Sequence, residues 1–339
     1  MKKNIYRDVL KNAWEITKNN KILWVFGLFA ALLGNGGEYQ ILVKTFDKFH
    51  IARNVVLNSA SQTFSGGFLK GLYNLSLYNP TEFILILVAV FSILFLIGFL
   101  IWLIVVFQVS LIAGADKGIS NKKITFQEGI NLGKEKFSSI LGINFISKSL
   151  ICLMLVLTGL PLLFLARRSE SILSLILYIL AFLILIPIAI IISFIAKYAS
   201  AFVVLKNKNF FESINKGWHL FLDNWIVSLE MAFFLFLLNF IVGLVALFAV
   251  IIISLPFITM AIIYSAAGLS YAFWTAIIMM LFIIVAIVAF AGAVLSVYQW
   301  SSWIIFFKKL TSRTTVLSKI ERTVKDFPAW IKARAKFGH

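Results

Sequence analysis

Charged residues are scarce in this sequence, and their scarcity argues against a soluble fold. Only 13% of the 339 residues are Asp, Glu, Lys or Arg, and 61% are hydrophobic. Soluble domains carry about 25% charged residues and about 45–50% apolar ones. A soluble chain of this composition would have too little polar surface to cover itself, whereas a lipid-facing surface removes that problem. The composition predicts an integral membrane protein.

Cysteine, histidine and the sequence signatures of catalysis are also nearly absent. Cys152 is the only cysteine, which excludes an internal disulfide and a zinc site with four cysteine ligands. The three histidines are far apart, and there is no Walker-type loop, no Gly-x-Ser-x-Gly elbow and no His-Glu-x-x-His. The acidic residues are few and do not cluster. We therefore predict no catalytic, cofactor-binding or metal-binding residue and no cofactor, and an enzyme is the less favoured class.

Long apolar runs define the predicted membrane spans. A helix needs about 20 apolar residues to cross roughly 30 Å of hydrocarbon. Residues 1–310 are predicted to form one transmembrane domain with six spans, at about 20–35, 83–114, 138–166, 171–196, 226–263 and 272–307. The first has a core of only twelve residues, which fits a signal peptide as well as a retained span. We favour a retained span, because the segment before it recurs later in the chain.

Between Met231 and Phe307 there is no charged residue, which is enough length for more than two passes. Two long helices with a turn near Gly268 suit the sequence best. Pro161, Pro187 and Pro256 each interrupt a different span and predict hinges there.

Basic residues indicate the orientation of these spans. Of 31 Lys and Arg residues, 24 lie in the N-terminal segment, the loops at 115–137 and 197–225, and the tail from Lys308, and six lie in the intervening loops. Positively charged loops stay in the cytoplasm. The pattern predicts a multi-pass protein of the cytoplasmic membrane with both termini in the cytoplasm. It also accounts for the net charge of +17 without nucleic acid, which is not an expected partner.

A short motif occurs twice, at a constant offset of 84 residues. The matching residues are Phe126, Glu128, Ile130, Asn131 and Gly133 in the first copy, and Phe210, Glu212, Ile214, Asn215 and Gly217 in the second. The N-terminal run is similar, with Leu10, Ala13 and Trp14 at the positions of Ile214, Gly217 and Trp218. The spacing predicts amphipathic helices at 5–18, 125–137 and 209–222, on the cytoplasmic side. Each precedes two spans, so we expect an all-α fold of three parallel hairpin repeats.

These motifs resemble those of a broad group of prokaryotic membrane proteins. Phe-x-Glu-x-Ile-x-x-Gly, the apolar helix end Tyr198–Leu205 and the long proline-containing spans are similar to the YciC-like proteins and to the membrane domain of some glycerophosphodiester phosphodiesterases. The resemblance implies a prokaryotic six-helix protein and, for most members, no assigned activity. The phosphodiesterase chemistry of that group belongs to a separate soluble barrel, which this chain does not contain.

Two charges fall within the predicted spans, where they are costly and hence candidate functional residues. Lys148 lies in the third span and Glu230 in the fifth. Under the 84-residue offset Lys148 corresponds to Ala232, within one turn of Glu230, so an ion pair between these residues is the first hypothesis. Separate snorkelling to the interface is the second, and coupling to a proton or substrate is the third.

The remaining segments are an outer loop at about 36–81 and a basic tail at 311–339. The loop is too short to form its own core and is predicted to cover the outer interface. The tail combines an apolar stripe with basic residues, which predicts an amphipathic helix attracted to anionic lipid headgroups. A protein partner or a homo-oligomer is also compatible with this sequence.

Three functions follow from these features. The first is a non-enzymatic scaffold, assembly or lipid-organising protein that works at the cytoplasmic interface. The second is a transporter or channel for a small solute or lipid that uses Lys148 and Glu230, and the third is a membrane-embedded lipid-modifying enzyme.

Overall fold

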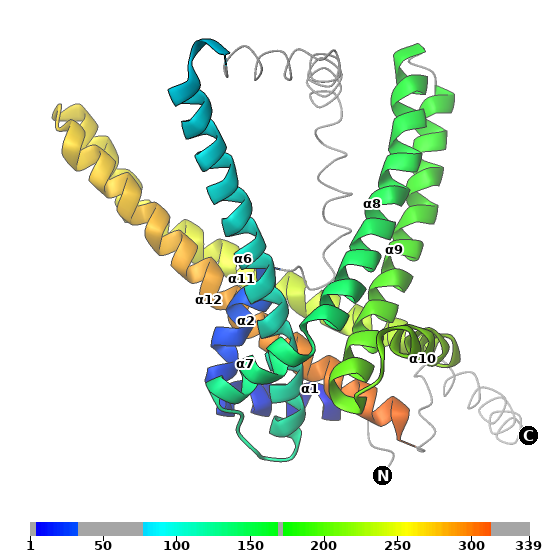
Figure 1. Ribbon diagram of the computed structural model, residues 1–339. Coiled ribbons are helices and arrows are strands. Elements are labelled where there is room, and N and C mark those ends of the chain that lie inside the picture. The colour runs from blue at the N-terminus through cyan, green and yellow to red at the C-terminus, as the bar shows by residue number, and fades with distance from the viewer. Residues whose placement is uncertain (1–4, 33–76, 169–171, 313–339) are drawn as a thin grey trace, which may run out of the picture. The chain divides into compact units, whose positions relative to one another are not determined.

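The computed structural model describes residues 5–32, 77–168 and 172–312, and every regular element in these ranges is an α-helix (Figure 1). Three of the helices are short and amphipathic, and they are called the short helices below: α1 (Ile5–Asn19), α7 (Phe126–Glu135) and α10 (Phe210–Asp223). The others are rich in apolar residues and comprise α2 (Ile22–Leu32), α6 (Pro80–Ile119), α8 (Phe137–Arg168), α9 (Ile172–Lys206), α11 (Trp225–Ala266) and α12 (Ser270–Thr311).

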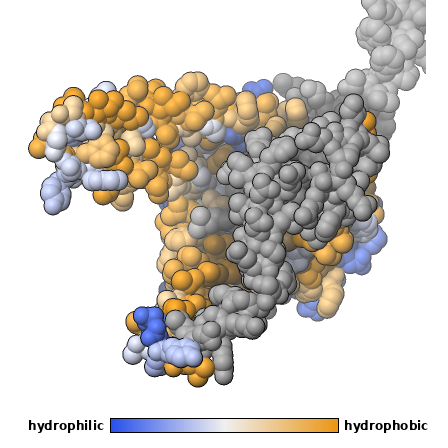
Figure 2. Space-filling model, turned by 90° about the horizontal axis from the view of Figure 1, so that it is seen from above, coloured by the Kyte–Doolittle hydropathy of each residue, from blue (hydrophilic) through white to orange (hydrophobic). Residues whose placement is uncertain are grey.

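Five helices, α6, α8, α9, α11 and α12, are long and apolar enough to cross a membrane. Orange hydrophobic residues dominate the part of the described surface seen in Figure 2. The chain thus has the helices of a multi-pass membrane protein, and the five long predicted spans are confirmed as helices. The predicted first span is represented by α2, whose eleven described residues extend only about 16 Å at 1.5 Å per residue.

Two predicted segments fall largely outside the described residues. These are the outer loop, which coincides with 33–76 almost throughout, and the basic tail, which continues beyond 312. The three prolines lie inside α8, α9 and α11, and each helix continues through its proline. Bending at Pro161, Pro187 and Pro256 stays a prediction.

The turn between α11 and α12 is the one that the sequence predicts. Gly268 has a φ of +70°, which glycine adopts without a steric cost. The amide of Gly268 donates to the carbonyl of Ser265, and that of Leu269 donates to the carbonyl of Tyr264 at 2.9 Å. This pair of bonds is a Schellman motif, which ends α11 and satisfies its last carbonyl groups. The charge-free stretch is therefore two helices.

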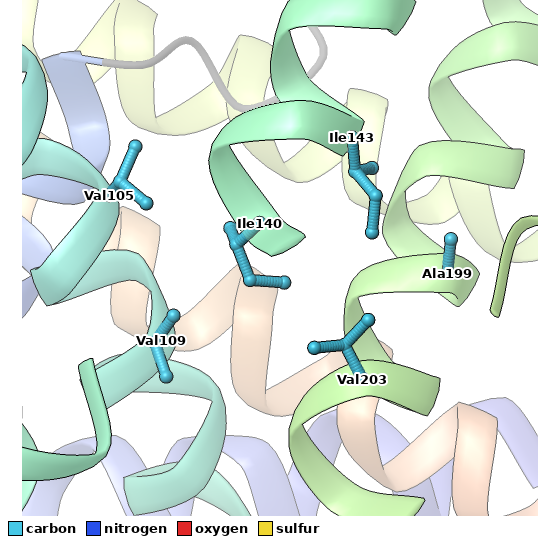
Figure 3. Close-up of a cluster of buried hydrophobic side chains, with 6 residues drawn as sticks. All are labelled: Val105, Val109, Ile140, Ile143, Ala199 and Val203. Carbon is cyan, nitrogen blue, oxygen red and sulfur yellow. The ribbon is translucent and has the colours of Figure 1, made fainter. Parts of the chain in front are cut away.

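The described residues form two compact units. One contains the described parts of Met1–Asn35, Val105–Ile143 and Phe194–His339, and the other contains those of Gly36–Ile104 and Asn144–Ser193. The first unit has a buried cluster to which α6, α8 and α9 each contribute two side chains (Figure 3). They are Val105 and Val109, Ile140 and Ile143, and Ala199 and Val203.

In the same unit α2 packs closely against α12. A Cβ atom on Gly27 would lie 2.5 Å from the carbonyl oxygen of Ala293 and 2.7 Å from a methyl carbon of Val297. Only glycine permits this approach of the two helices. Farther along α12, the side-chain amide of Gln299 donates to the side-chain oxygen of Asn239 on α11. This bond joins two apolar helices, as polar side chains do between membrane spans.

The contact at Gly27 predicts a specific loss of stability. Gly27→Ala forces α2 away from α12, so we expect the free energy of unfolding to fall by about 1–3 kcal/mol, as overpacking does elsewhere. The measurement is the apparent melting temperature of the protein in detergent. Gly243→Ala is the matched control, because a Cβ atom there meets nothing within 4 Å. Equal melting temperatures for the two variants would contradict the close packing.

Candidate functional site

The candidate site consists of the three short helices, α1, α7 and α10. Each buries a pair of residues spaced four apart, which are mostly small. The pairs are Val9 and Ala13, Gly129 and Gly133, and Ser213 and Gly217. The second and third pairs are related by the offset of 84 residues. The sequence reasoning identified Ala13, Gly133 and Gly217 but missed their partners, although the same alignment contains them.

The glycines let two of these helices touch the backbone of a longer helix. A Cβ atom on Gly133 would lie 2.7 Å from the carbonyl oxygen of Val106 in α6. A Cβ atom on Gly217 would lie 3.1 Å from the carbonyl oxygen of Ile195 in α9. Helices α7 and α10 therefore each lie against the long helix that precedes them in the chain, α6 and α9 respectively. Small residues allow this close approach between apolar helices.

The aromatic and aliphatic motif residues complete the inner faces. The ring of Phe126 stacks on that of Phe26 at a centroid distance of 5.6 Å. Phe210 and Ile214 pack against the buried cluster of α6, α8 and α9. Ile130 is half-buried, whereas Asn131 and Asn215 are exposed. The motif thus positions apolar residues inward, and its asparagines point outward.

The glutamate of each motif copy lies in the first turn of its helix and forms ion pairs with lysine, one for Glu128 and two for Glu212. Lys117 of α6 pairs with Glu128, and the amide of Glu128 donates to the Thr125 hydroxyl at 3.3 Å. Lys208 and Lys216 lie 3.0 and 2.9 Å from the carboxylate of Glu212. Hydrogen bonds from these lysines lower the pKa of both carboxyl groups. A carboxylate in the first turn also interacts favourably with the helix dipole.

Glu230 of α11 is hydrogen-bonded to the N-terminal helix, α1. The hydroxyl of Tyr6 donates to the Glu230 carboxylate, and the ring of Tyr6 lies 5.2 Å from that of Phe234. The sequence reasoning missed Tyr6, since nothing in the pattern links residues 224 positions apart. Lys148 lies exposed on α8, in the other unit. The pairing of Lys148 with Glu230 stays a prediction.

The described residues contain no group of three or more His, Cys, Asp or Glu side chains placed to hold a metal ion. What the described arrangement supplies is helix packing, ion pairs and hydrogen bonds between helices.

Comparisons with protein families, with curated proteins and with solved structures find no match to this chain. The resemblance to the YciC-like group stays an expectation from the sequence.

The lowered pKa of Glu128 predicts a pH dependence. A carboxyl group whose pKa is lower in the folded state stabilises the fold fully above its ordinary value of 4.5, and this contribution is lost as the pH falls below that value. We expect Glu128→Gln to lower the melting temperature at pH 7, and the difference from the wild type to shrink below pH 4.5.

Lys117→Met serves as the comparison, because it removes the main cause of the shift. Its effect should match that of Glu128→Gln, and the double variant should be no worse than either one. A difference between wild type and Glu128→Gln that stays constant from pH 7 to pH 3 would contradict the ion pair.

The contact between Tyr6 and Glu230 predicts coupling between two distant positions. Tyr6→Phe and Glu230→Gln should each cost about 0.5–1.5 kcal/mol, and the double variant should cost clearly less than their sum. The measurement is unfolding in detergent, with Tyr271→Phe as an exposed and neutral control.

The same cycle made with Lys148→Met and Glu230→Gln tests the predicted ion pair. Additive losses in that second cycle would show that the two charges do not interact.

Proposed function

We propose that this chain is a non-enzymatic protein of a prokaryotic cytoplasmic membrane that acts as a scaffold, assembly or lipid-organising component. The observation that carries the proposal is the shared docking of α1, α7 and α10. Their inner faces are buried, and the motif glutamates of α7 and α10 lie at the surface in ion pairs. The outward faces of such helices present a surface beside the membrane.

The proposed architecture is six spans arranged as three parallel hairpins, each introduced by one short helix on the cytoplasmic side. The short helices support it, because equivalent residues make equivalent contacts. Asn20 and Asn224 each donate a side-chain hydrogen bond to the carbonyl four residues earlier, at 3.1 Å in both cases. Three residues after each asparagine, Leu23 and Val227 are both buried. The ends of α1 and α10 thus match in detail.

The proposed orientation rests on charge. All three short helices lie in segments that carry the excess of Lys and Arg, which favours the cytoplasmic side. In this scheme the polar faces of the helices meet the cytoplasm and the headgroups of anionic lipids, where partner proteins also bind.

A transporter that uses Lys148 and Glu230 is the second candidate, favoured by a carboxyl group inside a membrane helix. The contacts of Glu230 support a fastening role instead, because its carboxylate accepts a hydrogen bond from Tyr6 of α1. Reconstituted vesicles distinguish the two. A proton flux that Glu230→Gln abolishes, in protein that remains folded, would favour transport.

The scaffold proposal predicts a partner that depends on surface charge. Arg7, Lys11 and Lys18 are exposed on α1. We expect the full chain, purified in mild detergent, to retain anionic lipid or a protein in a fixed ratio. The combination Arg7→Glu, Lys11→Glu and Lys18→Glu should reduce that ratio at least about fivefold with an unchanged melting temperature, because like charges repel an acidic partner.

The matched control keeps the charge and changes the side chains. The combination Arg7→Lys, Lys11→Arg and Lys18→Arg should retain the partner. If the wild type and both triple variants retained the same molecules in the same ratio, or if none of them retained any, the proposal that the polar face of α1 binds a partner would be wrong.

A further inference from the structure

Helix α10 carries a second apolar stripe that the described part of the chain leaves exposed. Phe211, Trp218 and Leu222 are 83%, 43% and 47% exposed. Their spacing of seven and then four residues places them on one face of the helix. This outer stripe is separate from the buried residues Ser213, Gly217 and Phe221, which face the protein core.

The outer stripe sets α10 apart from the other two short helices. On α7 the exposed residues after Phe126 are polar, and on α1 all but Trp14 are polar. On α10 the charged residues and His219 occupy a narrow sector formed by Glu212, Lys216, His219 and Asp223, and the exposed Asn215 lies between this sector and the outer stripe. Only α10 of these three helices is therefore apolar on both sides.

The stripe continues along the chain into an apolar surface of α11. Trp225, at the start of α11, is 53% exposed, and Leu229 and Phe233 after it are 49% and 62% exposed. Helix α11 is one of the five that are long and apolar enough to cross a membrane. The outer stripe thus adjoins a surface that lipid would cover, and tryptophan is enriched where such surfaces meet the headgroups.

Charge on this segment is nearly balanced. From Lys206 to Asp223 there are three lysines and two acidic residues. Two of the lysines lie within 3.0 Å of the same glutamate, Glu212. Attraction to an acidic partner is consequently weak here, so binding at this stripe would have to draw on the burial of apolar surface.

We propose that α10 lies in the surface of the bilayer, with its outer stripe inserted between lipid headgroups and acyl chains. Its inner face, with Ser213, Gly217 and Phe221, packs on the protein. The inference rests on the proposed function, since it names lipid as the partner of one of the three short helices. It differs in mechanism, because insertion does not require anionic lipid.

The test uses spin labels on the full chain in nanodiscs of phosphatidylcholine. Single-cysteine variants in a Cys152→Ala background carry the label at Phe211→Cys, Trp218→Cys or Leu222→Cys. The matched controls, His219→Cys and Asp223→Cys, are exposed on the polar sector. Oxygen partitions into lipid and a nickel chelate stays in water, so their relative effects on the label report which of the two it meets.

We expect the ratio of oxygen to nickel accessibility to be at least about fivefold higher at the three stripe positions than at the two controls. Adding 30% phosphatidylglycerol should leave that difference unchanged. Equal ratios at all five positions would overturn the proposal and would show that the stripe meets water. A difference that arises only with phosphatidylglycerol would overturn the apolar mechanism.

Contact with a second copy of the chain is a further outcome that overturns the proposal. It would broaden the spectra at the stripe, and dilution with unlabelled protein would remove the broadening. This experiment is independent of co-purification with charge variants of α1. If the stripe lies in lipid but no partner co-purifies, only the scaffold role is contradicted. If the stripe is exposed to water but a charge-dependent partner co-purifies, only the insertion of α10 is contradicted.

Discussion

Close approach of helix backbones is the constraint on which the described structure depends. Lipid tails are as apolar as leucine, so apolar helices gain little from the hydrophobic effect when they associate in a bilayer. Dense van der Waals contact between the helices has to supply the free energy of association instead. Gly27 against Ala293, Gly133 against Val106 and Gly217 against Ile195 are positions where a single methyl group would separate two helices or force a neighbour to shift. Small residues therefore decide which helices of the first unit meet.

Hydrogen bonds between side chains then fix the alignment of those helices. Asn239 bonds to Gln299 between α11 and α12, Tyr6 bonds to Glu230 between α1 and α11, and Tyr198 lies 2.7 Å from Ser228 between α9 and α11. A polar atom left without a partner in an apolar environment is costly. Sliding one helix along another breaks such a bond, so these contacts give the packed helices a defined register.

The sequence predicted the helices well and their inner faces only in part. The short helices were expected at 5–18, 125–137 and 209–222, and they occur within three residues of those limits. The periodicity of apolar residues shows that a helix is amphipathic. Gly129 and Ser213 are not large apolar residues, so this pattern did not identify them as contact positions. Tyr6 could not be predicted as the partner of Glu230, because only the folded chain brings them together. The outer stripe of α10 was not predicted, because the inner stripe alone explained the amphipathic pattern of this segment.

The inner and outer faces of the short helices are subject to different packing constraints. The inner faces are alike because each packs on longer helices, and only small or apolar side chains fit there. The outer faces are free of that requirement, and they differ: those of α1 and α7 are mostly polar, whereas that of α10 carries Phe211, Trp218 and Leu222. A large apolar side chain in water is unfavourable by about 1.5–3 kcal/mol relative to a buried one. Covering three such residues on one exposed face gains free energy, and for a helix that leads directly into α11 the adjoining bilayer surface is the apolar medium at hand.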